Sequence, residues 1–178
     1  MAARTGLALL LLLSMGPALA ADSWDKMLCM AGGGAPSANV LHCTRALEGG
    51  LFEAPEDRAR GLFKRGTAQI ETGAYKEAVA DFGEAIGLRP EYGEAFHNRG
   101  VAKWRMGKLE SALADFDESI ALGQVELWRA YKVRGDLKAE MGQLDEALAD
   151  YERSLAIRPD WDYARKALRR VMVRKQGN

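Results

Sequence analysis

Hydrophobic residues recur every three or four positions along most of the chain, which is the spacing of one face of an α-helix. Between Ala59 and Trp161 the pattern is interrupted by short turns, three of which begin with glycine: Gly73-Ala74, Gly107-Lys108 and Gly142-Gln143. Glycine takes the left-handed backbone that ends many helices, so each of these turns separates two helices of a hairpin. No run alternates between apolar and polar residues as a strand does. The pattern therefore predicts an all-α chain with seven or more helices and no sheet.

A repeat underlies the same region. Shifts of 34 and 35 residues superimpose Arg65-Gly66, Arg99-Gly100 and Arg134-Gly135. The turn glycines coincide under these shifts, and so do an alanine, an aspartate and an aromatic residue of each copy: Ala78, Ala112 and Ala147; Asp81, Asp115 and Asp150; Phe82, Phe116 and Tyr151. A repeat of this length predicts helical hairpins that stack on one another.

The period, the small residues at fixed offsets, and Pro90 and Pro159 at the ends of two units resemble the tetratricopeptide repeat. The resemblance implies a right-handed α-solenoid of helix-turn-helix units at residues 59–92, 93–126 and 128–161. One large side chain of each helix is expected to fill the space within its hairpin: Leu62, Phe96 and Tyr131 on first helices, and Phe82, Phe116 and Tyr151 on second helices.

Two flanking segments are expected to cap the solenoid. Residues 21–58 form the N-terminal cap, in which Ser37–Glu48 carries an apolar stripe of Val40, Leu41 and Leu47 and looks like a degenerate half-repeat. Residues 162–178 form a helix and a basic tail that close the last repeat. The cations of this helix suit a solvated C-terminal face: Arg165, Lys166, Arg169, Arg170, Arg174 and Lys175.

Residues 1–20 have the three parts of a secretory signal peptide. Arg4 gives a positive start, Leu7–Met15 an apolar centre, and Ala18-Leu19-Ala20 the small-residue pattern that signal peptidase cleaves. Cleavage after Ala20 removes 20 of the 178 residues and one arginine, and so leaves 158 residues with 24 basic and 25 acidic groups. An uncleaved anchor is the alternative, although the apolar stretch is shorter than the roughly 20 residues that cross a bilayer. We expect a periplasmic or secreted protein that does not span a membrane after cleavage.

The balance of charged residues bears on the class of partner. The chain has 25 Lys and Arg against 25 Asp and Glu, with a pI near 6.8. This balance gives no field that would attract a polyanion, so no nucleic-acid partner is expected.

Export changes how the only two cysteines are interpreted, because thiols pair in an oxidising compartment. Cys29 and Cys43 are expected to form a structural disulfide. A redox-active dithiol is the alternative, but such pairs usually have CxxC spacing. A metal role is not expected, because His42 beside Cys43 has no second Cys/His pair to complete four ligands.

The arginines of the repeat occupy its seventh position, where the family usually has leucine, and the aspartates occupy position 23. Both positions lie eight residues from the turn, which at about 1.5 Å per residue places them about 12 Å above it. Each arginine should therefore meet the aspartate of its own hairpin in a partly buried ion pair: Arg65 with Asp81, Arg99 with Asp115 and Arg134 with Asp150. The alternative is that these arginines bind an anion.

The resemblance also implies a concave groove that is lined by first helices and holds a peptide or helix of a partner. Phe63, His97 and Trp104 would form an aromatic strip beside Arg129 and Lys132, and aromatic residues and arginine are typical binding anchors. Packing between neighbouring first helices is the alternative for Trp104. The full set of expected groove residues is Arg60, Phe63, Thr67, Ile70, Glu71, Glu94, His97, Asn98, Val101, Trp104, Arg105, Arg129, Lys132, Asp136, Ala139 and Glu140.

Some members of this family clamp a C-terminal carboxylate with five residues. The matching positions here hold Phe63, Thr67, Asn98, Arg129 and Val133. Only Asn98 fits that clamp, and Arg129 is basic in place of lysine, although Lys64 or Lys132 could partly substitute. Binding of this type is therefore doubtful.

Motifs for catalysis are missing from the sequence. There are only two histidines, His42 and His97, and there is no HExxH, GxSxG or phosphate-binding loop. No enzyme activity, metal or cofactor is expected. We expect a scaffold or adaptor that binds an envelope protein whose identity the sequence does not give. Two alternatives stay open: a binder of anionic polymer or membrane surface through the basic C-terminal helix, and a redox accessory protein that uses Cys29 and Cys43.

Overall fold

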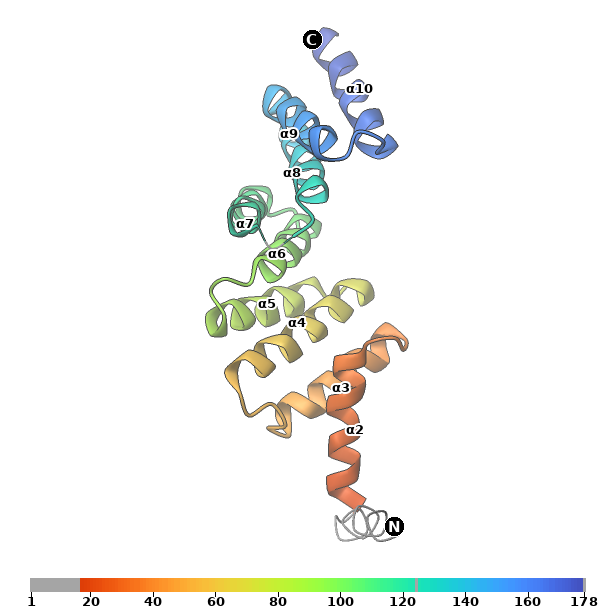
Figure 1. Cartoon of the computed structure of the whole chain (residues 1–178), viewed down its shortest axis with the longest axis vertical. Coiled ribbons are helices and arrows are strands. Elements are labelled where there is room, and N and C mark those ends of the chain that lie inside the picture. The colour runs from red at the N-terminus through yellow and green to blue at the C-terminus, as the bar shows by residue number, and fades with distance from the viewer. Residues whose placement is uncertain (1–16, 124, 178) are drawn as a thin grey trace, which may run out of the picture.

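The computed structural model describes residues 17–123 and 125–177, and within those residues it consists of nine helices without a strand. The helices stack from one end of an elongated molecule to the other, with the N- and C-terminal helices at opposite ends (Figure 1). The prediction of an all-α solenoid is confirmed. The helices are α2 (Pro17–Ala31), α3 (Pro36–Glu48), α4 (Pro55–Thr72), α5 (Tyr75–Leu88), α6 (Gly93–Arg105), α7 (Leu109–Leu122), α8 (Leu127–Glu140), α9 (Leu144–Ile157) and α10 (Asp162–Gln176).

Three hairpins form the body of the solenoid: α4 with α5, α6 with α7, and α8 with α9. Their turns begin at Gly73, Gly107 and Gly142, whose φ angles of 80°, 74° and 81° are left-handed. A residue with a side chain rarely adopts this backbone, which explains why glycine recurs at the turn.

A second glycine of each hairpin allows its two helices to approach closely. A Cβ atom on Gly66 would lie 2.9 Å from the Phe82 ring, and one on Gly100 would lie 2.8 Å from Phe116. Gly135 lies in the same relation to Tyr151, at 2.9 Å. The glycine of the first helix and the aromatic ring of the second are therefore complementary parts of one contact.

The rings of the second helices are core, as expected, but two residues of the first helices are not fully buried. Leu62, Phe82, Phe116 and Tyr151 are buried, whereas Phe96 and Tyr131 are half-buried. The guanidinium groups of Arg99 and Arg134 lie over the Phe96 and Tyr131 rings, at 5.2 and 5.5 Å from the ring centroids. These two rings therefore lie at the margin of the core, where arginine side chains cover part of each ring.

The N-terminal cap consists of α2 and α3, which pack on each other and on α4. The buried face of α3 is formed by Cys43, Ala46 and Leu47. Leu41 is 47% exposed, so the expected apolar stripe is wrong at that position, because Leu41 lies outside the buried face of the helix. Phe52, in the connection to α4, is buried against Gly61, where a Cβ atom would lie 2.7 Å from its ring.

Residues 1–16, which contain most of the predicted signal peptide, lie outside the described residues. Helix α2 begins at Pro17 and runs through the expected cleavage position after Ala20. Among the described helices, none has the length and apolar character that crossing a membrane requires.

Candidate functional site

Three arginine–aspartate pairs connect the helices within the hairpins. In each pair the arginine donates from Nε and Nη2 to the two carboxylate oxygens of the aspartate, over distances of 2.6 to 2.9 Å. The aspartates are buried and the arginine side chains are only 11 to 20% exposed. These arginines are therefore occupied within the fold, which leaves little support for the alternative that they bind an external anion.

Asp150 is the most buried of the three aspartates and has the most cationic neighbours. It also accepts from Lys138 at 2.9 Å and from Arg153 at 3.3 Å. Burial alone would raise the pKa of this carboxyl group, but hydrogen bonds from Arg134 and Lys138 outweigh burial and lower the pKa. In the first pair, the hydrogen bond to Asp81 raises the pKa of Arg65.

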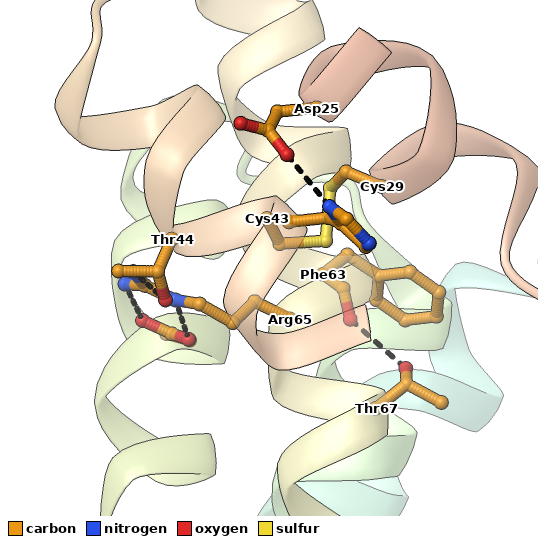
Figure 2. The surroundings of a disulfide bond; sticks show 9 residues. Asp25, Cys29, Cys43, Thr44, Phe63, Arg65 and Thr67 are labelled. Carbon is orange, nitrogen blue, oxygen red and sulfur yellow. Dashed lines mark hydrogen bonds and ion pairs between the residues drawn. A yellow bond between two sulfur atoms is a disulfide. The ribbon is translucent and has the colours of Figure 1, made fainter. Parts of the chain in front are cut away.

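A disulfide links α2 to α3 in the N-terminal cap. Figure 2 shows Cys29 and Cys43 joined beside α4, with Cα atoms 4.6 Å apart. The predicted disulfide is confirmed. Both cysteines are buried, so an external thiol would reach the sulfur atoms only after the cap opened. This burial favours a structural bond over a redox-active pair.

Polar contacts on either side of the disulfide hold the cap in place (Figure 2). The His42 imidazole lies 2.6 Å from a carboxylate oxygen of Asp25, which connects α3 to α2. Arg65 of α4 donates to the Thr44 hydroxyl of α3 at 3.3 Å, in addition to its bonds with Asp81. The cap is thus connected to the first arginine–aspartate pair. Among the described residues, no group of three or more His, Cys, Asp and Glu side chains could hold a metal ion.

Two adjoining cavities follow the first helices of the hairpins. The larger, of about 640 Å³, lies between Phe63 of α4, His97 of α6 and Arg129 of α8. The second, of about 550 Å³, shares His97 and Arg129 and continues to Tyr163 of α10. Because the cavities share these two residues, they form a depression along α4, α6, α8 and the start of α10, and a third cavity, described below, adjoins the second through Lys132 and Tyr163. We call this depression the first-helix groove.

Phe63 contributes to the groove with only part of its ring. It stacks on Tyr92 with centroids 5.0 Å apart and leans on Phe82 at 5.8 Å. Thr67 and Asn98 lie close by and are hydrogen-bonded to each other at 3.4 Å. The N-terminal end of the groove is therefore held by contacts within the protein.

His97 is the central residue of the groove. Its ring lies 5.4 Å from Phe116. Its buried Nδ1 atom has no hydrogen-bond partner among the described residues. Burial lowers the pKa of His97, so the imidazole is neutral at pH 7.

Trp104 packs between first helices, which was the alternative interpretation of this residue. Its ring meets Phe116 edge-on, with centroids 6.4 Å apart, and its Nε1 donates to Glu140 of α8 at 2.8 Å. It does not line either cavity of the groove with Phe63 and His97. The expected aromatic strip is therefore interrupted at Trp104, whose half-buried ring bonds to the next repeat and does not line the cavities with Phe63 and His97.

Trp104 instead lines a third cavity, of about 490 Å³, between α6, α8 and α10. Lys132 and Asp136 also line it and form an ion pair at 2.5 Å. Asp136 accepts a second hydrogen bond from the Tyr151 hydroxyl at 3.0 Å. Burial and the neighbouring carboxylate raise the pKa of Tyr151 well above its ordinary value.

The other expected groove residues lie at the margins. Arg60 and Arg105 are exposed and line none of these cavities. Val101 is half-buried and packs against the core around Phe116 and Leu137. The five positions of the carboxylate clamp are also divided, because Phe63, Asn98 and Arg129 line the first cavity, whereas Val133 lines only the second.

Sequence reasoning missed an aromatic cluster at the C-terminal end of the groove. The Trp128 and Trp161 rings meet edge-on with centroids 4.4 Å apart, and Tyr163 follows at 6.5 Å from Trp161. The guanidinium groups of Arg129 and Arg158 lie 4.7 and 4.4 Å from the Trp128 ring centroid. The only signal in the sequence was tryptophan at both ends of the third repeat.

Three of the six cations of α10 bond to other groups of the protein. Arg165 pairs with Asp162, Lys175 pairs with Asp145, and Arg174 donates to the Ala139 carbonyl. Lys166 and Arg169 are exposed. The helix therefore presents a smaller free charge than its composition indicates.

A family model described as TPR repeat matches residues 66–107. A second, described as Tetratricopeptide repeat, matches residues 93–122 and 129–160. The chain belongs to the tetratricopeptide repeat (TPR) family. No curated protein matches the chain in sequence.

Solved TPR structures share the fold. MamA residues 41-end from Desulfovibrio magneticus RS-1 superimposes with a TM-score of 0.74 at 20% identity, over 92% of this chain and 88% of MamA. The first TPR domain of human RPAP3 is 29% identical, with a TM-score of 0.61 over 66% of this chain and 91% of the domain. The second TPR domain of human RPAP3, in complex with the HSP70 peptide SGPTIEEVD, is 25% identical, with a TM-score of 0.62 over 66% of this chain and 98% of the domain.

Proposed function

We propose that this TPR protein is a non-enzymatic scaffold or adaptor of the cell envelope, which binds a peptide or helix of a partner protein. The first-helix groove carries the proposal, because the first helices of three successive hairpins and the start of α10 contribute side chains to one depression long enough for an extended segment. A similar TPR domain, that of human RPAP3, binds a peptide in the solved complex.

The groove has the composition of a binding surface. Its side chains include aromatic rings and arginine, and ring–ring and cation–π contacts within the protein hold them in position. Rings and guanidinium groups held in place in advance lose little conformational entropy when a partner binds.

Affinity purification from the source organism, followed by mass spectrometry, tests this function. The wild-type protein is compared with Arg129→Glu, which changes a residue shared by both cavities, and with Glu94→Arg, which changes the first cavity. Arg169→Glu on the exposed side of α10 is the control. The proposal expects a partner that is retained at high salt, lost from one or both groove variants and kept by the control.

Two other outcomes would replace the proposal. If the protein sediments with peptidoglycan or anionic vesicles at low salt and high salt abolishes this sedimentation, a polymer or membrane-surface binder is favoured. A Cys29–Cys43 pair that exchanges with thiols in the folded protein at neutral pH would favour a redox accessory.

The envelope location rests on the predicted signal peptide. N-terminal sequencing of the protein from the cell envelope should begin at Ala21. Replacing Ala18 and Ala20 by arginine should prevent the cleavage after residue 20 and leave the uncleaved chain. A mature protein that begins at residue 1 in the cytosol would overturn this part of the proposal.

A further inference from the structure

We infer that the C-terminal part of the first-helix groove binds an acidic peptide segment through an apolar, preferably aromatic, side chain placed between carboxylates. This inference rests on the proposed function and names the chemistry of the partner. The pocket is the 550 Å³ cavity lined by His97, Trp128, Arg129, Lys132, Val133, Arg158, Trp161 and Tyr163. We call it the tryptophan pocket.

The charge of the tryptophan pocket is one-sided. Arg129, Lys132 and Arg158 are three of the eight lining residues, and no lining residue carries a carboxylate, although each of these three pairs with a carboxylate outside the lining. The other large cavity of the groove includes Glu94 and Glu126 and is mixed in charge. A ligand with negative charge is therefore favoured at the C-terminal end of the groove and not along its whole length.

The cations of the pocket keep capacity for a ligand. Arg129 and Arg158 pair through Nε with Glu126 and Asp160, which lie at 2.9 and 3.6 Å. Both arginine side chains are well exposed, by 62 and 46%, so these surface pairs contribute little stability. A guanidinium has five N–H donors and can bind a second carboxylate while it keeps the first. Lys132 is more committed, because its side chain is 18% exposed and bonded to Asp136.

The rings of the pocket supply the apolar part of the recognition. Trp128 is held by Trp161 and by the two guanidinium groups that lie over it. Tyr163, at the entrance, is 70% exposed, although it lies 6.5 Å from Trp161. An aromatic ligand ring could pack against Tyr163 and Trp161, and rings that pack offset or edge-on stabilise contacts beyond the area they bury.

A peptide fits better than an isolated anion, because the tryptophan pocket continues into the rest of the groove through His97 and Arg129. A chain anchored in the pocket could extend from α10 towards α4. The charges and rings act on side chains of the ligand, so a free C-terminal carboxylate is not required.

Fluorescence polarisation with labelled peptides tests the inference. The probe is the nine-residue peptide GSEEWEESG with a blocked N-terminus and an amidated C-terminus. GSQQWQQSG lacks its charges, GSEEAEESG lacks its ring, and polyglutamate serves as an acidic polymer. We expect the probe to bind at least about tenfold more tightly than each of these comparators.

Variants locate the binding. Arg158→Glu should weaken probe binding about tenfold and Tyr163→Ala about fivefold, because the first reverses a pocket charge and the second removes an exposed ring. Arg169→Glu, outside the pocket, should change it less than about twofold. Circular dichroism melting verifies that the variants fold, and since Arg158 and Tyr163 are exposed we expect unchanged melting.

Equal binding of the uncharged peptide, equal binding of polyglutamate, or insensitivity to both pocket variants would overturn the inference. Binding of the probe only with a free C-terminal carboxylate would overturn it as well. If the probe fails while Arg129→Glu still loses a native partner, the ligand assignment falls and the scaffold function stands. If no native partner is retained at all, the scaffold function itself falls.

Discussion

Arg134 of α8 reaches beyond its own hairpin to Asp117 of α7, whose carboxylate oxygen accepts from Arg134 Nη1 at 2.7 Å. The corresponding atom of Arg65 donates to Thr44 of α3. In the middle hairpin this atom belongs to Arg99, and it lies 3.9 Å from where a Cβ atom of Gly83 would be. Each arginine thus joins two helices of its own hairpin and points one further donor at the preceding helix.

Gly83 lies opposite the Nη1 atom of Arg99 and, having no side chain, offers it no side-chain acceptor. Gly83→Asp should therefore stabilise the protein, because the new carboxylate would reach Arg99 as Asp117 reaches Arg134. Replacing glycine within α5 also favours the helix, so we expect a gain of about 1 kcal/mol in the free energy of unfolding. Urea unfolding of Gly83→Asp and Gly83→Ala separates the two contributions. Alanine favours a helix over aspartate by about 0.6 kcal/mol, so a Gly83→Asp variant less stable than Gly83→Ala by that full amount would show that Arg99 does not use the new carboxylate.

Removing an aspartate of the buried pairs should destabilise the fold strongly. Asp115→Ala leaves Arg99 and Lys103 facing a buried site without their anion, which we expect to cost about 3 kcal/mol. The exposed Glu118→Ala on the same helix is the control and should cost less than about 0.5 kcal/mol. Retained partner binding at a temperature where the variant is folded would agree with a structural role. Unchanged melting with lost binding would contradict it.

Asp150 should make the stability depend on acid pH. Its folded pKa lies below the ordinary 3.8, so its contribution is complete above that value and is lost as pH falls through the folded pKa. Asp150→Asn should melt well below the wild type at pH 7, and the gap in melting temperature should narrow as the pH falls below about 4, because the carboxylate of the unfolded chain is protonated first and that of the folded protein only at lower pH. Asp160→Asn is the exposed control. A gap that stayed constant from pH 7 to pH 3 would count against the assignment.

The close glycine–ring contact should be intolerant of a single methyl group. Gly100→Ala places a Cβ atom 2.8 Å from the Phe116 ring and should cost about 1 to 3 kcal/mol, because the ring must shift within a packed hairpin. Gly87→Ala, in helix α5 with open space around the new atom, should stabilise by about 0.5 to 1 kcal/mol. Thermal unfolding of both variants measures the difference. The reverse order would mean that the hairpin can widen at little cost.

Loss of the disulfide should loosen the N-terminal cap. The bond closes a loop with a sequence separation of 14, and its removal in Cys29→Ser/Cys43→Ser should cost about 3 kcal/mol. Proteolysis should then begin in α2, which packs mainly on α3. A reductant should lower the melting temperature of the wild type and leave the double variant unchanged. Equal sensitivity of both proteins would show that the bond does not hold the cap.

The sequence by itself determined the repeating part of this protein, because the repeat depends on residues at fixed, short separations along the chain. Periodic apolar residues and turn glycines predict the hairpins, and the equal distance of Arg99 and Asp115 from their turn predicts that they meet. Such relations involve residues a fixed number of positions apart within one unit, so helix geometry alone is enough to derive them. The expected cysteine pairing followed from the predicted export and from the number of cysteines.

Only the tertiary structure decided which groove residues are available to a partner. Trp104 donates to Glu140 of the next repeat and Phe63 stacks on Tyr92 of its own repeat, so contacts within the protein engage part of both rings. The tryptophan pocket forms because the turn after α9 brings Trp161 against Trp128, and α10 then adds Tyr163. These contacts depend on the angle at which one hairpin and the final helix stack on the previous ones. That angle is set by packing between units, which the spacing of residues within a unit does not specify.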